Sequence, residues 1–323
     1  MYEDLTVDEF ADVIAEAAEK YRNWGRWGED DRVGTLNFID DAKKLEAGRL
    51  VKRGASFSLS LELGPNGPQT GFMGRTNPVH TFTQTADDHI HGRQGFPHGV
   101  GGSDDVVFMA LQCATHWDGL GHIYDRGLAY NGRVANEVVT PAGDLVTGIE
   151  HATPLAISRG VLLDIGRAVG GGELEDGFAI TEEHILATIE AQGETSRVGR
   201  GDIVVVRTGQ LERARANGWK GYTGGDAPGF SFSTADWLHR SEIAAIAIDT
   251  WGFEVRPYEV RDAFSPLHQV VVTNMGMIIG EMWDPSELAE DCAETGVYDF
   301  LLVASPLPFT GAVGAPVSPI AIK

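Results

Sequence analysis

The sequence predicts an α/β fold in a single domain that spans residues 1–323. The first observation is an alternation of short apolar segments and helical patterns from residue 160 almost to the end of the chain, as expected where strands and helices alternate. The second is composition, because 42% hydrophobic and 22% charged residues are typical of a globular protein. The third is that no repeat, low-complexity segment or linker divides the chain, so one large core is expected.

The second half of the chain supplies most of the expected elements. Five apolar segments predict strands, over residues 160–166, 202–209, 243–249, 276–281 and 298–305. Helical patterns lie between them, over residues 180–193, 233–242 and 284–296. Thr181 and Gly193 are suitable caps for the two ends of the first of these helices.

The first half contains fewer regular patterns. Apolar residues at helical spacing predict an amphipathic helix over residues 7–20, and alternation predicts a half-buried strand over 57–63. Residues 104–112 predict a buried strand. The Gly- and Pro-rich loops at 64–103 and 219–230 are long enough to cover a functional site.

Charge excludes several classes of partner. The formal net charge is −22, from 47 acidic and 25 basic residues. Nucleic acid is therefore not expected as a partner, because phosphate binding needs a basic face. Anionic membranes are disfavoured for the same reason, and a small-molecule substrate is expected instead. An acidic surface mildly favours a bound divalent cation.

The cysteines and the chain ends favour a reducing cytoplasm. Cys113 and Cys292 lie far apart without CxxC spacing, so a disulfide framework is not expected. Residues 1–20 contain no basic region followed by an apolar stretch, so no signal peptide is predicted. The long uncharged segment 300–322 contains four prolines, which disfavour a membrane-spanning helix.

The segment QCATHWDGLGH, residues 112–122, concentrates ligand-type side chains. Gln112 and His116 would lie roughly 13 Å apart on a strand, too far for ligand bonds of about 2.1 Å to one ion. The spacing is suitable if the preceding strand breaks into a turn, so that His116 and Asp118 project to the same side. The glycines at 119 and 121 then let the chain return, so that His122 faces the same point.

Two interpretations of this segment remain open on spacing alone. Imidazole nitrogen with carboxylate and amide oxygens is a ligand set that suits Zn²⁺ or Mn²⁺. Alternatively, His116 and Asp118 form a hydrogen-bonded pair in a loop. His89 and His91 are a second candidate chelating pair. The sequence has no GxSxG motif, so a serine nucleophile of the α/β-hydrolase type is not supported. It also has no HExxH, P-loop or GxGxxG motif at a strand–helix junction.

The same segment resembles the central motif of the cyclase family of metal-dependent hydrolases, His-x-Gly-Thr-His-x-Asp-x-x-x-His. Thr115, His116, Asp118 and His122 match, while Gln112 stands where the first histidine usually is. A second family element, a histidine followed by a glutamate across a helix and a strand, resembles the segment PLHQVVVTNMGMIIGE, residues 266–281. The family includes bacterial kynurenine formamidase, isatin hydrolase and trans-dienelactone hydrolase. The two ends of this chain are similar to the longer branch of the family.

The resemblance implies a fold, a cofactor and a reaction. The fold is a swivelling β/β/α-like one with a mixed central sheet flanked by helices. The cofactor is a divalent ion, Mn²⁺ or Zn²⁺. The reaction is opening of a lactone, cyclic amide or formyl-amide bond by a metal-activated water. A homodimer or higher homo-oligomer is also implied. An inactive binding protein and a metal-dependent cyclase or dehydratase are the alternatives.

The resemblance also implies roles for individual residues. The metal ligands are Gln112, His116, Asp118 and His268. His122 and Glu281 are catalytic, with His122 moving a proton. Alternatively, Glu281 and His268 complete the metal shell or hold a second ion. Residue type, rather than the resemblance, makes several aromatic residues candidate walls for a planar or aromatic substrate: Trp24, Trp27, Phe38, Trp117 and Trp251. Arg26 and Arg75 are candidates to bind a substrate carboxylate.

Overall fold

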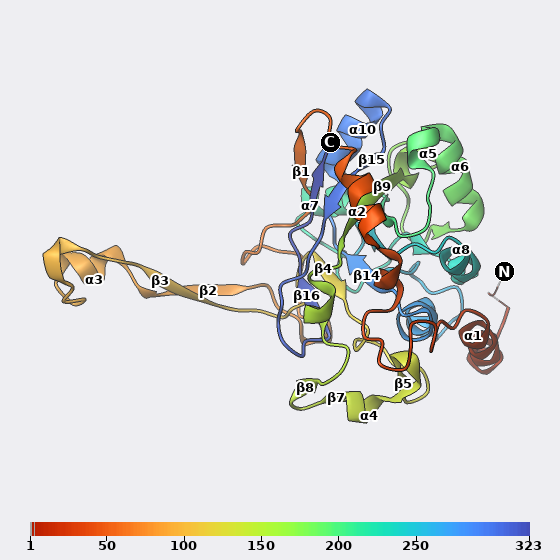
Figure 1. Ribbon diagram of the computed structural model, residues 1–323, viewed down its shortest axis with the longest axis horizontal. Coiled ribbons are helices and arrows are strands. Elements are labelled where there is room, and N and C mark those ends of the chain that lie inside the picture. The colour runs from red at the N-terminus through yellow and green to blue at the C-terminus, as the bar shows by residue number, and fades with distance from the viewer. Residues whose placement is uncertain (1, 3) are drawn as a thin grey trace.

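The fold is a mixed α/β architecture around one curled nine-stranded sheet, with helices packed on its faces (Figure 1). The computed structural model describes residues 2 and 4–323. Across the sheet the strands follow the order β1, β17, β15, β9, β11, β13, β14, β4 and β16. Their bounds are Ser56–Ser58 (β1), His116–Asp118 (β4), Ile157–Asp164 (β9), Ile203–Arg207 (β11), Ala245–Ile248 (β13), Ile278–Glu281 (β14), Asp299–Val303 (β15), Gly314–Pro316 (β16) and Ile320–Ile322 (β17).

The centre of the sheet is parallel and both sides are antiparallel. Strands β9, β11, β13 and β14 pair in parallel. Antiparallel strands extend the sheet from β9 to β1 on one side and from β14 to β16 on the other. The five strands predicted in the second half are all present in this sheet. The mixed character on the β14 side arises because β4 joins β14 antiparallel and β16 joins β4 antiparallel, and both come from distant parts of the chain.

Four short two-stranded pairings lie outside the central sheet. They are formed by β2 (Val79–Gln84) with β3 (Asp104–Phe108), β5 (Leu128–Ala129) with β6 (Arg133–Val134), β7 (Val139–Thr140) with β8 (Gly143–Asp144), and β10 (Ala179–Ile180) with β12 (Gly229–Phe230). The predicted buried strand at 104–112 is wrong in two respects. Only residues 104–108 form a strand, β3, and all five of them are exposed.

The predicted helices are confirmed with small shifts of their ends. They are α1 (Val7–Lys20), α6 (Glu182–Gln192), α8 (Ala235–Arg240) and α10 (Ser286–Thr295). The further helices are α2 (Asp41–Gly48), α3 (Ala86–Ile90), α4 (Ala135–Val138), α5 (Ile165–Ala168), α7 (Gln210–Ala216) and α9 (Pro266–His268), and α9 continues into the π-helical segment η8 (Gln269–Met275). Thr181 and Gly193 cap α6 as expected. Among the helices of residues 2 and 4–323, none has the length and apolar character needed to cross a membrane.

Short 3-10 turns complete the element order. They are η1 (Gly34–Phe38), η2 (Phe72–Gly74), η3 (Pro97–Gly99), η4 (Tyr130–Gly132), η5 (Ile149–Ala152), η6 (Glu194–Ser196) and η7 (Phe232–Thr234). Together with the loops they link the sheet to the helices that cover it.

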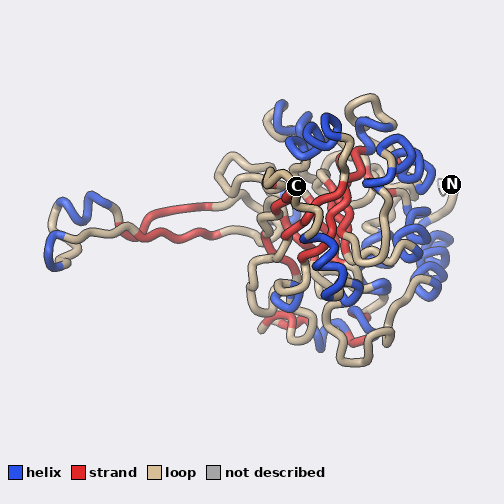
Figure 2. Tube along the Cα trace, turned by 45° about the horizontal axis from the view of Figure 1, so that its top comes forward, coloured by secondary structure: helices blue, strands red, loops and turns tan. Residues whose placement is uncertain are grey.

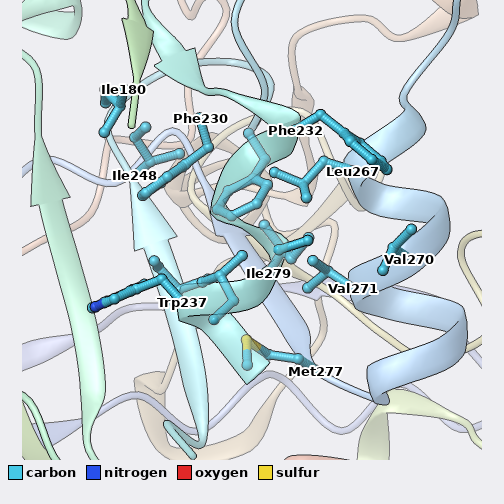
Figure 3. Close-up of a cluster of buried hydrophobic side chains, with 14 of the residues drawn as sticks. Ile180, Phe230, Phe232, Trp237, Ile248, Leu267, Val270, Val271, Met277 and Ile279 are labelled. Atoms are coloured by element: carbon cyan, nitrogen blue, oxygen red, sulfur yellow. The ribbon is translucent and has the colours of Figure 1, made fainter. Parts of the chain in front are cut away.

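The main core lies between one face of the sheet and the helical segment 266–275. Its members include Phe232, Ile279, Leu267 and Val271, all buried. Figure 3 shows Leu267 and Val271 on the helix directed toward Phe232 and Ile279. Apolar burial of this kind stabilises by roughly 25 cal/mol per Å². The packing therefore fixes the helix that carries His268 against the strand that carries Glu281.

A long ribbon extends away from this body (Figures 1 and 2). We call residues 79–108 the arm. Strands β2 and β3 form its shaft, and α3 and η3 lie near its tip. The predicted site-covering loop at 64–103 is thus divided between a loop on the body and most of the arm.

Candidate metal centre

A cluster of polar side chains lies at one face of the sheet, where β4 meets β14. We call it the polar cluster, and its members are His116, Asp118, His122, His268 and Glu281. Strand β4 is only three residues long, but alternation along it turns His116 and Asp118 to the same face. The antiparallel register places Glu281 of β14 directly opposite His116. Two motifs 165 positions apart in the chain (116 to 281) therefore meet because two strands pair.

The turn expected before His116 is present, and Thr115 anchors it. The Thr115 hydroxyl donates to the Met282 carbonyl at 2.6 Å and accepts from the Leu61 backbone N–H at 2.8 Å. After Asp118, small residues are needed for close packing. A Cβ on Gly121 would lie 2.1 Å from an Asp144 carboxylate oxygen, and one on Gly119 would lie 2.9 Å from the Val313 carbonyl oxygen.

The imidazole of His116 is oriented with its free nitrogen toward the carboxylates. Its Nδ1 lies 2.7 Å from the Ala114 carbonyl oxygen, an acceptor only, so Nδ1 carries a proton. Its Nε2 lies 3.2 Å from Asp118 Oδ1 and 3.6 Å from Glu281 Oε2. Both Nε2 of His116 and Oδ1 of Asp118 are buried without a hydrogen-bond partner. The two residues lie on strand β4 rather than in a loop.

Unpartnered buried polar atoms are costly, and their chemistry fits a divalent cation. One ligand atom each from His116, Asp118 and Glu281 can be chosen so that all lie within 4.8 Å of one another. A search of the described residues for three or more histidine, cysteine, aspartate or glutamate side chains close enough to bind one metal ion finds this group. One imidazole nitrogen and two carboxylates suit Zn²⁺ or Mn²⁺. The residues present therefore fit a metal ion.

His268 is held on the other side of the carboxylates by Glu254. Its Nδ1 lies 2.7 Å from Glu254 Oε1, and its Nε2 lies 3.2 Å from Glu281 Oε1 and 3.9 Å from Asp118 Oδ2. Burial alone would lower the pKa of His268, but the hydrogen bonds of Glu254 and Glu281 raise it well above its usual value. Glu254 was not predicted from the sequence, which has no motif around it.

The charged groups of the polar cluster shift one another's pKa values. Burial would raise the pKa of the Asp118 carboxyl, but His122, His116 and His268 hold it below its usual range. Burial would lower the pKa of His116, while Asp118 and Glu281 raise it. For His122, burial prevails and lowers its pKa. The carboxylate is thus ionised and His122 is neutral near pH 7.

His122 and Gln112 flank the two ligands from the same segment. His122 Nε2 lies 3.6 Å from Asp118 Oδ1, and its side chain is 19% exposed, so it reaches the solvent side of the cluster. Gln112 is half-buried, and its Nε2 lies 2.9 Å from where a Cβ on Gly314 would lie. Gly314 pairs with Asp118 across β16 and β4, so Gln112 lies over the same face as the cluster. Its role as a ligand stays a prediction.

A small cavity of about 60 Å³ opens beside the polar cluster. Besides cluster members, the residues around it are Met73, Arg75, Ile123, Trp251, Gly252, Phe253, Glu254, Arg256, Tyr258, Phe264 and Ser265. Trp251 and Arg75 therefore lie at the cavity, and their roles toward a substrate stay predictions. A larger open groove of about 730 Å³ near Trp219 contains no member of the cluster.

The other predicted substrate walls lie elsewhere. Trp117 is wrongly predicted, because alternation along β4 turns it to the opposite face from His116. There it is fully buried, donates to the Ala304 carbonyl at 2.7 Å and packs against Trp283. Trp27 is also wrongly predicted, since it packs edge-on against Phe38 away from the cavity. Trp24 and Phe38 do not line the cavity either.

Two further sequence candidates are not brought to the site. Arg26 forms an ion pair with Glu242 and does not line the cavity. His89 and His91 lie at the arm tip, in and directly after α3, where residues two apart on a helix do not face each other. His91 Nδ1 instead contacts the Asp87 carbonyl oxygen at 2.9 Å.

Comparisons with known proteins place the chain in a family. The model of the Cyclase family matches residues 57–255. A solved structure described as a novel cyclase shares 35% identity, covers 95% of this chain and 99% of its own, and has a TM-score of 0.84. A comparison of the sequence with curated proteins gave no match.

More distant structures share the fold. Isatin hydrolase A from Labrenzia aggregata is 16% identical, with 87% of this chain and 98% of its own covered and a TM-score of 0.59. Isatin hydrolase A from Ralstonia solanacearum is 14% identical, with 87% and 95% covered and a TM-score of 0.61. The family match over most of the chain and the 35% identical structure agree with the motif and the sheet, and the chain belongs to the cyclase family.

Proposed function

We propose that this protein is a metal-dependent hydrolase that opens a lactone, cyclic amide or formyl-amide bond. The observation that carries the proposal is the pair of buried atoms, His116 Nε2 and Asp118 Oδ1, which face each other and Glu281 without hydrogen-bond partners. Isatin hydrolases share this fold, so a cyclic amide belongs among the candidate substrates.

His116, Asp118 and Glu281 would hold a single Mn²⁺ or Zn²⁺ ion, and Gln112 and His268 are candidates to complete its shell. A bound divalent ion supplies two effects, a lower pKa for a bound water and polarisation of the substrate carbonyl. Glu281 thus moves from the catalytic role predicted from the sequence to that of a ligand. This assignment agrees with its place opposite His116.

His122 is the residue suited to move a proton. Its lowered pKa keeps the imidazole neutral and able to accept a proton at pH 7. It lines the cavity on the solvent side of Asp118. In the proposed reaction His122 accepts the proton of the attacking water and returns it to the leaving oxygen or nitrogen. Glu254 keeps His268 in one orientation while this happens.

Metal analysis of protein purified without chelator tests the proposal. We expect near-stoichiometric Mn or Zn in the wild-type protein and its loss in His116→Ala. His151→Ala is the matched control, because His151 is half-buried but outside the cluster. The metal-loaded protein is then screened against lactones, cyclic amides and formyl-amides. Absence of metal from the wild type after incubation with both ions would contradict the proposal.

Two other functions give different results in the same screen. A binding protein on this scaffold would hold the metal and convert none of the substrates. A cyclase or dehydratase would remove one water from its substrate, whereas a hydrolase adds one. Product mass spectrometry separates these two outcomes.

A further inference from the structure

We propose that the substrate carries a carboxylate group and that Arg75 and Arg256 bind it at the cavity. The proposal deepens the function proposed above and rests on it, because it concerns the substrate of the same site. It makes the substrate a planar or aromatic carboxylate that bears the lactone or amide bond to be opened.

The first argument is that these arginines have no carboxylate partner. The chain has 47 acidic residues, and its buried arginines are paired with them, as Arg159 is with Asp202 and Asp299. Within residues 2 and 4–323, by contrast, neither Arg75 nor Arg256 has a carboxylate oxygen within 4.0 Å. Both are only partly exposed. A partly desolvated guanidinium without an anion is costly, and a carboxylate ligand would offset that cost.

The second argument is that the acidic groups near the cavity are already engaged. Glu254 is hydrogen-bonded to His268, and Asp118 and Glu281 face His116. These three carboxylates would repel an anionic substrate. Two arginines at the same cavity are the groups that would counter this repulsion. Arg75 lines the same cavity as Asp118 and His122.

The third argument is that the guanidinium of Arg256 lies close to two aromatic rings. Its Cζ lies 4.5 Å from the centre of the Trp251 ring and 4.9 Å from that of Tyr258, and its Nη1 donates to the Tyr258 hydroxyl at 3.1 Å. Stacking of this kind orients the planar donor fork. Phe253 and Phe264 add apolar surface around the same cavity. A ligand with a flat apolar body and one carboxylate matches these surroundings.

The test compares ligands that differ in charge but little in shape. Binding of benzoate and benzamide to the metal-loaded protein is measured by calorimetry, for the wild type, Arg75→Gln and Arg256→Gln. Arg49→Gln is the matched control, an exposed arginine outside the cavity. We expect benzoate affinity to fall roughly 10- to 100-fold in both cavity variants, as for loss of a charged hydrogen bond. Benzamide binding should change little in either.

Hydrolysis of N-formylanthranilate and formanilide separates this inference from the proposed function. Benzoate binding that depends on the arginines supports the carboxylate site even if neither formyl-amide is cleaved, in which case only the hydrolase proposal fails. If the wild type and Arg75→Gln each cleave N-formylanthranilate and formanilide equally well, the carboxylate site is overturned and the hydrolase proposal stands. The carboxylate site is also overturned if benzoate binding is lost on metal removal but is unchanged in Arg75→Gln and Arg256→Gln. It is overturned as well if the wild type does not bind benzoate.

Discussion

Glu254 binds both the backbone and the side chain of His268. Its Oε1 accepts from the His268 backbone N–H at 2.6 Å and from Nδ1 at 2.7 Å. One carboxylate oxygen therefore binds both the first turn of the helix that carries His268 and its imidazole ring. Nε2 is left facing Glu281 and Asp118. Such a partner orients a histidine toward a metal site.

Removal of this carboxylate should weaken metal binding without unfolding the protein. We expect Glu254→Ala to lower metal affinity by roughly 10- to 100-fold, the usual effect of losing a group that orients a ligand histidine. Glu254→Gln should lose less, because its amide oxygen can still accept from Nδ1. Titration against a competing chelator measures the affinity, and circular dichroism checks the fold. Wild-type affinity in Glu254→Ala would exclude a role for Glu254 in positioning His268.

The two tryptophans Trp117 and Trp251 should respond differently to substitution. We expect Trp117→Phe to lower the free energy of unfolding by about 1–3 kcal/mol, because it removes a buried hydrogen bond and ring volume. Its KM should stay unchanged, since Trp117 lies on the core face of β4. Trp251→Phe should raise KM for an aromatic substrate. Urea unfolding and steady-state kinetics measure the two effects, and a KM change in Trp117→Phe would disagree with its position.

Gly34 should tolerate no side chain, for a reason specific to its surroundings. Its φ is +57°, and a Cβ would lie 1.8 Å from the Gly276 carbonyl oxygen, at the end of η8. We expect Gly34→Ala to lower the free energy of unfolding by about 3 kcal/mol or more. Gly25→Ala is the control, with a φ of +74° but open space around it. Its cost should be about 1 kcal/mol, from the backbone alone. Equal costs would mean that the contact with Gly276 is not tight.

The two free cysteines should be unreactive in the native protein. Burial raises the thiol pKa of Cys113 and of Cys292 to about 11. Because the thiolate is the reactive form, only about 0.1% of each thiol is ionised at pH 8. We expect little reaction with a disulfide reagent at pH 8 and complete reaction after unfolding in urea.

The same shift makes a prediction for stability at alkaline pH. A thiol whose folded pKa is raised from 9.0 to about 11 favours the folded state below pH 9 and loses that contribution as pH rises toward 11. Cys113→Ser leaves Cys292 as the only thiol and isolates its contribution in urea unfolding between pH 8 and 11. Rapid labelling of native protein at pH 8 would contradict the raised pKa values.

Much of the fold could be predicted from local sequence. Alternating strands and helices from residue 160, the capped helix α6 and the motif at 112–122 all follow from short-range patterns. The turn before His116 and the shared orientation of His116 and Asp118 follow from small residues and strand alternation. Such features depend on residues that are near one another in the chain, and short-range patterns of this kind can be recognised in a single sequence.

The rest was decided by contacts between distant segments. Residues 106–108 are apolar, but nothing else within residues 2 and 4–323 buries them, so they lie exposed on the arm. Trp117 is in the core because Trp283 and Ala304 lie on the other face of β4. Glu281 faces His116 through strand register, and Glu254 reaches His268 from a segment without a motif. The sequence determined which ligand types are present and in what order. Only tertiary pairing decided which of them share one site, because strand register and burial depend on segments far apart in the chain.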